Sequence, residues 1–92
     1  MYSLKYSNNA ERALKNLDHQ VGKRIYEALQ SIRADPRAYV EEMKHPKRSE
    51  PLYKYRIGGF RVIMTLFDKE LIVLVVDVGP RKTRYKKYGG KG

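Results

Sequence analysis

The segment Tyr53–Phe67, YKYRIGGFRVIMTLF, decides the fold. Two runs of β-branched and aromatic residues flank Gly58-Gly59, a pair that favours a two-residue turn between antiparallel strands. In that register Arg56 lies directly opposite Arg61. Alternation then places on one face Tyr53, Tyr55, Ile57, Phe60, Val62, Met64 and Leu66. Lys54, Arg56 and Arg61 share the other face, so the hairpin has an apolar side and a basic side.

A second turn at Asp68–Glu70 leads into the apolar run Leu71–Val78. We expect a three-residue loop here, which places Asp77 opposite Arg61. A two-residue turn would instead move every side chain of the last strand to the other face and send Asp77 into the core. The expected register puts on the apolar side Ile72, Leu74, Val76 and Val78. The second half of the chain is therefore predicted to be a three-stranded antiparallel meander.

The first half begins with a short strand and continues with helical periodicity. Residues 2–6 alternate between apolar and polar side chains, as a half-buried strand does. We expect Asn8 or Asn9 to cap a helix, a break near Asp18, and a second helix that ends at Ala34 or Asp35 before Pro36. Apolar residues recur at helical spacing: Ala10, Ala13, Leu14 and Leu17, then Val21, Ile25, Ala28, Leu29 and Ile32. Residues 37–44 are expected to add a helical turn and residues 45–51 to form a loop.

These elements predict an α+β fold: an N-terminal strand, a helical hairpin and a three-stranded antiparallel meander. The helices are expected to pack on one sheet face and to leave the other free. A chain of 92 residues suits a single domain, 1–92. Its end, 81–92, is a basic tail that we expect to be partly disordered.

Composition narrows the classes of function. The chain has no Cys and only two His, His19 and His45, which argues against disulfides, a metal site or a cofactor; we expect both His at the surface. The longest apolar stretch, Leu71–Val76, is too short to span a bilayer, and residues 1–10 lack the apolar region of a secretory signal. We therefore expect a cytoplasmic protein that is not a membrane protein.

Charge is the strongest compositional signal. Twenty Lys and Arg against ten Asp and Glu give a net charge of +10, and residues 51–92 hold ten of the basic residues but three of the acidic ones. A basic domain of this kind commonly binds a polyanion. In the tail, cations and tyrosines are interleaved, which suits phosphate binding and base stacking on single-stranded RNA. The plainer interpretations are solvated lysines, a solvated tail, and an Arg-Asp-Arg cluster that merely covers an exposed face.

Several motifs in order resemble the RelE/ParE toxin superfamily: Tyr53–Ile57, then Gly59-Phe60-Arg61-Val62-Ile63, then Val78-Gly79-Pro80-Arg81-Lys82 leading to Tyr85. The resemblance covers nearly the whole chain and implies a RelE-like fold and a toxin of a type II toxin–antitoxin system. In the RelE branch such a toxin enters the ribosomal A site and cuts the bound mRNA without a metal. A cognate antitoxin neutralises it in a hetero-oligomeric complex.

The resemblance also implies the site residues. The implied catalytic set is Lys54, Arg56, Arg61, Arg81 and Tyr85, with Tyr88 as the competing tyrosine. The interleaved cations and tyrosines of the tail separately give the expected RNA-binding set: Lys82, Arg84, Lys86, Lys87 and Tyr88. The alternatives are a noncatalytic RNA- or ribosome-binding module and a ParE-like inhibitor of DNA gyrase.

Overall fold

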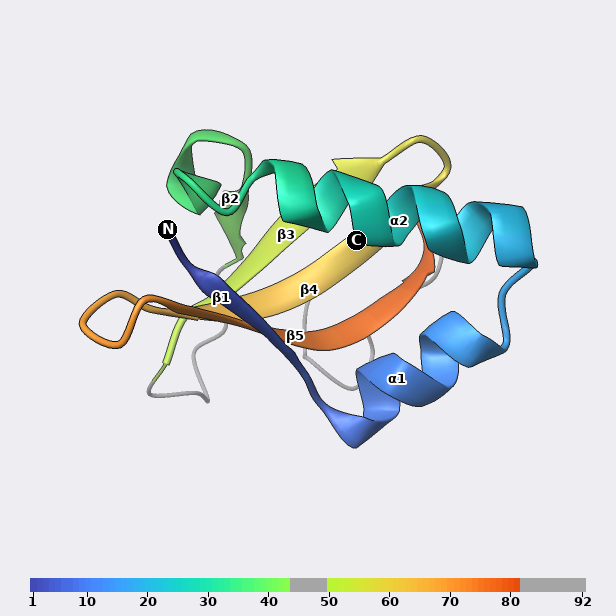
Figure 1. The fold of residues 1–92 in the computed structure, drawn as a ribbon, viewed down its shortest axis with the longest axis horizontal. Coiled ribbons are helices and arrows are strands. Elements are labelled where there is room, and N and C mark those ends of the chain that lie inside the picture. Colours follow the sequence, from blue (N-terminus) through green and yellow to red (C-terminus); the bar gives the residue numbers. More distant parts are fainter. Residues whose placement is uncertain (44–49, 82–92) are drawn as a thin grey trace.

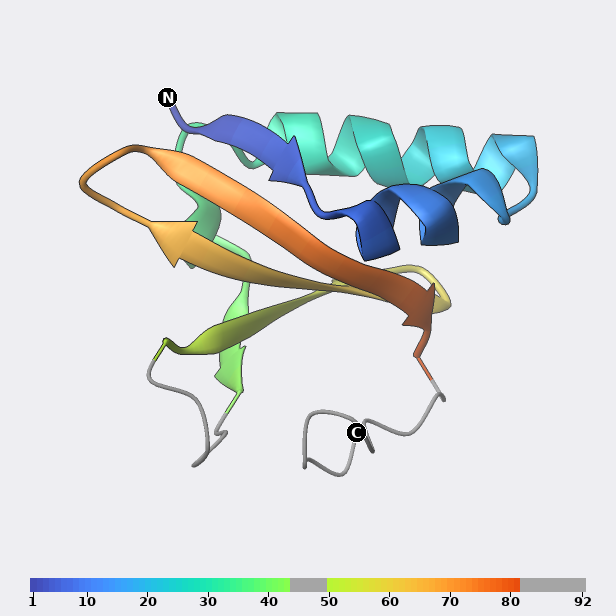
Figure 2. The same cartoon turned by 90° about the horizontal axis from the view of Figure 1, so that it is seen from below.

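Five strands form one mixed sheet in the computed structural model, which describes residues 1–43 and 50–81 (Figure 1). The strand order is β1-β5-β4-β3-β2; β1 runs parallel to β5 and the other neighbours are antiparallel. Two helices lie on one face of the sheet (Figure 2), so the predicted α+β architecture is confirmed. The elements are β1 Ser3–Tyr6, α1 Asn8–Lys15, α2 His19–Ser31, η1 Pro36–Ala38, β2 Glu41–Met43, β3 Leu52–Ile57, β4 Phe60–Phe67 and β5 Ile72–Pro80.

The hairpin of β3 and β4 has the predicted register. Ile57 pairs with Phe60 across the Gly58-Gly59 turn, and Arg56 pairs with Arg61. Gly58 has φ 57°, a left-handed conformation that glycine adopts without the steric cost of a Cβ. The turn residues therefore fix which side chains of both strands face the helices.

The hairpin of β4 and β5 differs from the prediction. Its turn has four residues, because Phe67 pairs with Ile72 and Leu71 takes a φ of 55°. The register then shifts between Ile63 and Met64. The shift is a β-bulge, in which one extra residue of one strand stays out of the ladder.

The bulge changes which side chains of β5 enter the core. Val78 is buried in the cluster beneath the helices as expected, but Val73 and Val75 take the place of the expected Ile72, Leu74 and Val76. Asp77 pairs with Ile63 in the ladder, not with Arg61 as expected. The physical reason for the prediction still holds, because the extra residue keeps the Asp77 carboxylate out of the core.

The helix boundaries require two corrections. Ser7, rather than Asn8 or Asn9, caps α1, and its hydroxyl accepts a hydrogen bond from the backbone N–H of Ala10 at 3.0 Å. The predicted break near Asp18 is confirmed, since Asp18 caps α2. That helix ends at Ser31, before Ala34 or Asp35.

The early end of α2 has a local cause. The carbonyl of Arg33 accepts a hydrogen bond from the N–H of Tyr2 at 2.8 Å, and the Arg33 Nε donates to the Tyr2 carbonyl at 2.7 Å. The bond to Tyr2, the residue before β1, thus occupies the Arg33 carbonyl that a longer α-helix would use.

The segment after α2 contains one expected and one unexpected element. Pro36–Ala38 forms the helical turn, but Glu41–Met43 is a strand, β2, which pairs with β3. The alternation of so short a strand is easily missed. Most of the loop expected at 45–51 lies outside the described residues.

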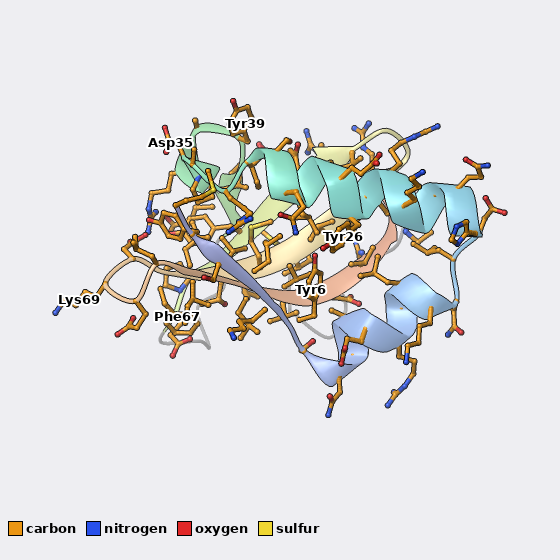
Figure 3. The ribbon with its side chains drawn as sticks, viewed as in Figure 1. Tyr6, Tyr26, Asp35, Tyr39, Phe67 and Lys69 are labelled. Carbon is orange, nitrogen blue, oxygen red and sulfur yellow. The ribbon has the colours of Figure 1, made fainter. Side chains whose placement is uncertain are left out.

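The core lies between α2 and the sheet. Ile25, Leu29 and Ile32 are spaced four and three residues apart and are at most 1% exposed. Burying each such side chain contributes roughly 1.5–3 kcal/mol. Tyr6 points from β1 toward α2 near the exposed Tyr26 (Figure 3), and burial raises the pKa of Tyr6 to about 12.

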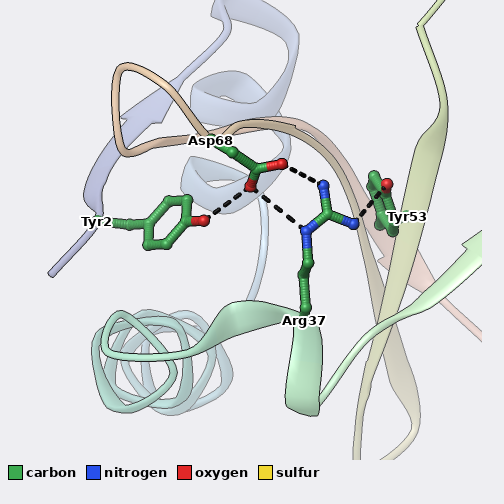
Figure 4. A network of polar contacts seen from close by, with 4 residues as sticks. All are labelled: Tyr2, Arg37, Tyr53 and Asp68. Carbon is green, nitrogen blue, oxygen red and sulfur yellow. Dashed lines mark hydrogen bonds and ion pairs between the residues drawn. The ribbon is translucent and has the colours of Figure 1, made fainter.

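A polar network joins the N-terminus, the η1 segment and the β4–β5 turn (Figure 4). Asp68 accepts hydrogen bonds from the Tyr2 hydroxyl at 2.7 Å and from two guanidinium nitrogens of Arg37, at 2.5 and 3.3 Å. Arg37 also donates to the Tyr53 hydroxyl at 2.8 Å and lies over its ring. The hydrogen bonds from Arg37, and then that from Tyr2, lower the pKa of Asp68.

This network predicts a dependence of stability on pH. The folded-state pKa of Asp68 is lower than its ordinary value of 3.8, so its contribution is complete above that value and is lost as pH falls through the lowered pKa. In urea titrations we expect Asp68→Asn to be less stable than the wild type at pH 6 and the difference to shrink below about pH 4. Glu70→Gln, an exposed change on the same turn, is the control. Parallel pH profiles for wild type and Asp68→Asn would contradict the assignment.

Candidate functional site

The sheet face opposite the helices carries three of the predicted cations. Lys54 and Arg56 project from β3 on the same side as Arg61 of β4, as the paired register requires. Their exposure differs: Arg56 is exposed, Lys54 is half-buried and Arg61 is 2% exposed. We call these three residues, with Glu41, Asp77 and Gly79 on the neighbouring strands, the basic face.

The prediction that this side of the sheet is free is wrong at its centre. Leu52 and Ile63 are fully buried there and form a second apolar cluster with Met43 and Val76. Met43 comes from the unexpected strand β2, and Val76 from the bulge in β5. These two features add apolar side chains beside the cations.

Glu41 of β2 is the functional candidate that sequence reasoning missed. It pairs directly with Lys54 in the ladder, and its Oε1 lies 3.6 Å from the Lys54 Nζ and 3.4 Å from an Arg56 guanidinium nitrogen. The Glu41 side chain is 59% exposed, so these pairs add little stability. One carboxylate thus holds two cations side by side and reduces their repulsion. The sequence signal that could have revealed this strand is the alternation in Glu41-Glu42-Met43, but three residues are too few to predict a strand.

Arg61 forms an ion pair with a different carboxylate, that of Asp77. A guanidinium nitrogen of Arg61 donates to the Asp77 Oδ2 at 3.5 Å, and both side chains are at most a tenth exposed. Because Arg56 pairs with Glu41, the described ion pairs do not form the single Arg-Asp-Arg cluster considered from the sequence. The cross-strand repulsion between Arg56 and Arg61 is offset by two carboxylates on different strands.

Gly79 makes room for the Arg61 side chain. The two residues are ladder partners, and a Cβ on Gly79 would lie 2.7 Å from an Arg61 guanidinium nitrogen. Any larger side chain at this position would therefore have to displace the guanidinium. This contact explains why a glycine follows Val78 in the motif Val-Gly-Pro-Arg.

Arg81 lies at the tip of the first hairpin. Its backbone N–H donates to the Gly59 carbonyl at 2.9 Å, and its exposed guanidinium donates to the Gly58 carbonyl at 3.4 Å. The chain thus brings Arg81 to the turn that joins the strands of Arg56 and Arg61. The other predicted site residues lie outside the described residues: Lys82, Arg84, Tyr85, Lys86, Lys87 and Tyr88.

A groove opens on the helical side of the molecule, opposite the basic face. Its apolar lining includes Leu14, Leu17 and Tyr26, while Lys15 and Lys23 lie at its rim with the exposed His19. Leu14 and Leu17 come from the end of α1 and the link that follows, and Tyr26 from α2. An apolar groove with basic rims suits an amphipathic acidic segment.

Over 1–43 and 50–81, no three His, Asp or Glu side chains gather as metal ligands would. In that same part of the chain, neither helix has the length and apolar character of a bilayer-spanning helix.

The fold, taken together with the family model that matches this chain, places the protein in the RelE/ParE toxin superfamily. The family model of the ParE toxin of the type II toxin–antitoxin system parDE matches residues 4–85, so the chain belongs to that family. It is thus a type II toxin, and the fold and family expected from the sequence are confirmed. Comparison with the curated proteins gave no significant sequence match.

Solved structures of related proteins share the fold. A chain of the RelBE2 toxin–antitoxin complex from Mycobacterium tuberculosis matches with a TM-score of 0.77 and 18% identity, covering 87% of this chain and 98% of that one. A chain of the archaeal RelE–RelB complex from Pyrococcus horikoshii matches with a TM-score of 0.70 and 23% identity, covering 87% of this chain and 94% of that one. The isolated RelE toxin of E. coli matches with a TM-score of 0.70 and 21% identity, covering 95% of this chain and 92% of that one.

The contact between Gly79 and Arg61 predicts that Gly79→Ala weakens growth arrest by the toxin. The added methyl group displaces the Arg61 guanidinium from its place beside Asp77, while the fold is kept because the end of one side chain can move. The measurement is growth after induced expression, with the thermal midpoint of the purified variant alongside. Gly59→Ala is the matched control, since its Cβ meets nothing within 4 Å. Equal growth arrest by both variants would show that this placement of Arg61 is unimportant.

Proposed function

We propose that this toxin is a ribosome-dependent, metal-independent endoribonuclease that cuts mRNA in the ribosomal A site. The observation that supports it most is the gathering of Lys54, Arg56 and Arg61 on one sheet face, with Arg81 bonded to the turn beside them. A gyrase-directed or purely structural surface does not need four cations at one end of a hairpin.

The reaction needs charge stabilisation more than a protein nucleophile. The 2′-oxygen of the substrate attacks the adjacent phosphorus, its proton passes to a base, and the bond from phosphorus to the 5′-oxygen breaks. The 5′-oxygen takes up a proton, which leaves a 2′,3′-cyclic phosphate and a 5′-hydroxyl end. Negative charge accumulates on the phosphorane oxygens, and preorganised cations aimed at them lower the barrier.

We assign Arg61 and Arg81 to the scissile phosphate, and Lys54 and Arg56 to the transition-state charge and the 2′-hydroxyl. The guanidinium forks of arginine suit phosphate oxygens, which accept two parallel hydrogen bonds. Tyr85 is assigned to stacking on a base. The Arg61 side chain is 3% exposed in the free protein, so RNA reaches it only after the groups that cover it move, while the guanidinium stays beside Asp77.

The carboxylates of the basic face have a role in this proposal. Glu41 engages Lys54 and Arg56 in the free toxin, and an RNA phosphate offers the same cations a competing partner. The exchange costs little because Glu41 is largely solvated. Glu41 would thus keep the cations arranged until the substrate arrives.

Inhibition of DNA gyrase is the second candidate. It is favoured by one observation, that the matching family model is that of the ParE toxin. The basic face favours the nuclease, because ParE-type members are expected to lack this constellation. A noncatalytic RNA- or ribosome-binding module would use the same cations without cutting.

Primer extension on a defined mRNA in programmed ribosomes tests the proposal. We expect cuts inside the A-site codon that require ribosomes and persist in EDTA-treated toxin. Arg81→Ala should lower the cleavage rate by about a hundredfold, the typical cost of removing a group that stabilises transition-state charge. Arg24→Ala, an exposed change of the same type on α2, is the control and should cut normally.

The other outcomes separate the alternatives. Toxin that binds ribosomes but leaves the mRNA intact would contradict the nuclease and indicate a binding module. Intact mRNA together with loss of plasmid supercoiling by gyrase would establish the second candidate.

We also propose that an antitoxin covers the groove between α1 and α2 in a toxin–antitoxin complex. The solved RelB–RelE complexes share this fold, and the basic rim of the groove suits an acidic helix. The double change Lys15→Glu and Lys23→Glu should weaken binding of the cognate antitoxin by about tenfold in calorimetric titration, because both charges on the rim reverse. Lys69→Glu on the β4–β5 turn is the control. Unchanged affinity would place the antitoxin elsewhere.

A further inference from the structure

The second half of β5 is held by the start of α1. β1 ends at Tyr6, which pairs with Val75, so β5 has no β1 partner beyond that point. The Ser7 hydroxyl donates to the Val76 carbonyl at 3.1 Å, and the Asn9 side-chain amide donates to the same carbonyl at 3.1 Å. The first turn of α1 therefore fixes the bulge of β5 in place of a neighbouring strand.

Asn9 makes one further contact that the helix itself does not need. Its amide donates to the Asp77 Oδ1 at 3.0 Å. Ser7 already caps α1, so an exposed Asn at the second helical position has no capping duty. Asn also has a lower helix propensity than Ala. The hydrogen bond to Asp77 explains why an asparagine occupies this position.

Asp77 passes this constraint to Arg61. Its Oδ1 accepts from Asn9, and its Oδ2 accepts from an Arg61 guanidinium nitrogen at 3.5 Å. On its other side the guanidinium lies against Gly79. Asp77 and Gly79 therefore restrict the rotamer of Arg61 from two sides, and the Asn9 amide holds the Asp77 carboxylate in place.

We infer that Asn9 and Asp77 are positioning residues that orient the Arg61 guanidinium for the scissile phosphate, an inference that rests on the proposed nuclease function. An arginine side chain has several rotatable bonds, and orienting it before the substrate binds reduces the entropy lost in the transition state. Neither residue needs to touch the RNA. Their effect is on the rate of the chemical step, because they act through Arg61.

Single-turnover cleavage on saturating programmed ribosomes tests this chain of contacts. Asn9→Ala should lower the cleavage rate constant by about tenfold, the order expected for loss of a hydrogen bond to a charged group, and leave ribosome affinity unchanged. Asn9→Asp, which keeps the shape but replaces the donor with a carboxylate facing Asp77, should lose at least as much. Asn8→Ala, an exposed change one residue earlier, is the matched control and should cleave normally.

The effect must depend on Arg61. In an Arg61→Ala background, or Arg61→Gln if the first variant is unstable, Asn9→Ala should cause no further loss. Equal losses in the wild-type and the Arg61-substituted backgrounds would show a general structural effect and overturn the inference. A normal cleavage rate for Asn9→Ala would also overturn it.

A second measurement keeps the inference separate from the nuclease activity. NMR relaxation of the Arg61 Nε–Hε pair reports how firmly the guanidinium is held in the free protein. Asn9→Ala should lower its order parameter, whereas Asn8→Ala should not. If the wild type does not cut RNA, a lowered order parameter still supports the positioning of Arg61 and only the proposed function fails. An unchanged order parameter overturns the positioning.

Discussion

The bulge in β5 is the constraint on which both faces of the sheet depend. In a regular strand, residues an odd number of positions apart point to opposite faces. Val75 and Val78 are three apart, yet both lie in the core beneath the helices. Both valines can face the core only if the strand holds an extra residue between them, and the register shift against β4 provides that extra residue. The same shift turns Asp77 toward Arg61, so core packing and charge placement have one origin.

The basic face shows how a sheet tolerates a concentration of like charges. Opposed Arg56 and Arg61 would repel, but a carboxylate from each flanking strand stands beside one of them. The two carboxylates differ in environment. Glu41 is largely solvated, so a phosphate can displace it from Lys54 and Arg56 at small cost, whereas Asp77 is nearly buried and gives Arg61 a fixed direction. One pair is therefore suited to exchange and the other to positioning.

Sequence reasoning succeeded where a local rule determined the geometry. Gly58-Gly59 specified a two-residue turn, and that turn specified every partner along β3 and β4. It failed at Asp68–Leu71, because nothing in the composition of that turn indicates that Leu71 adopts a φ of 55°. It also missed the bulge, because an extra residue within a run of valines does not change the apolar pattern. Glu41 was missed for another reason: a three-residue strand shows too little alternation to be distinguished from a turn. Arg81 was placed only through its resemblance to a family motif.

Helix α1 belongs to the layer on one face of the sheet (Figure 2) and also contacts the basic face, because Asn9 bonds to Asp77. α1 contributes Leu14 and Lys15 to the groove at its C-terminal end. At its other end Asn9 bonds to Asp77, which in turn accepts a hydrogen bond from the guanidinium of Arg61. A short helix moves largely as a unit, so a partner that shifts the end of α1 would also shift the support of Arg61. The same helix therefore links the surface proposed for the antitoxin to the surface proposed for RNA.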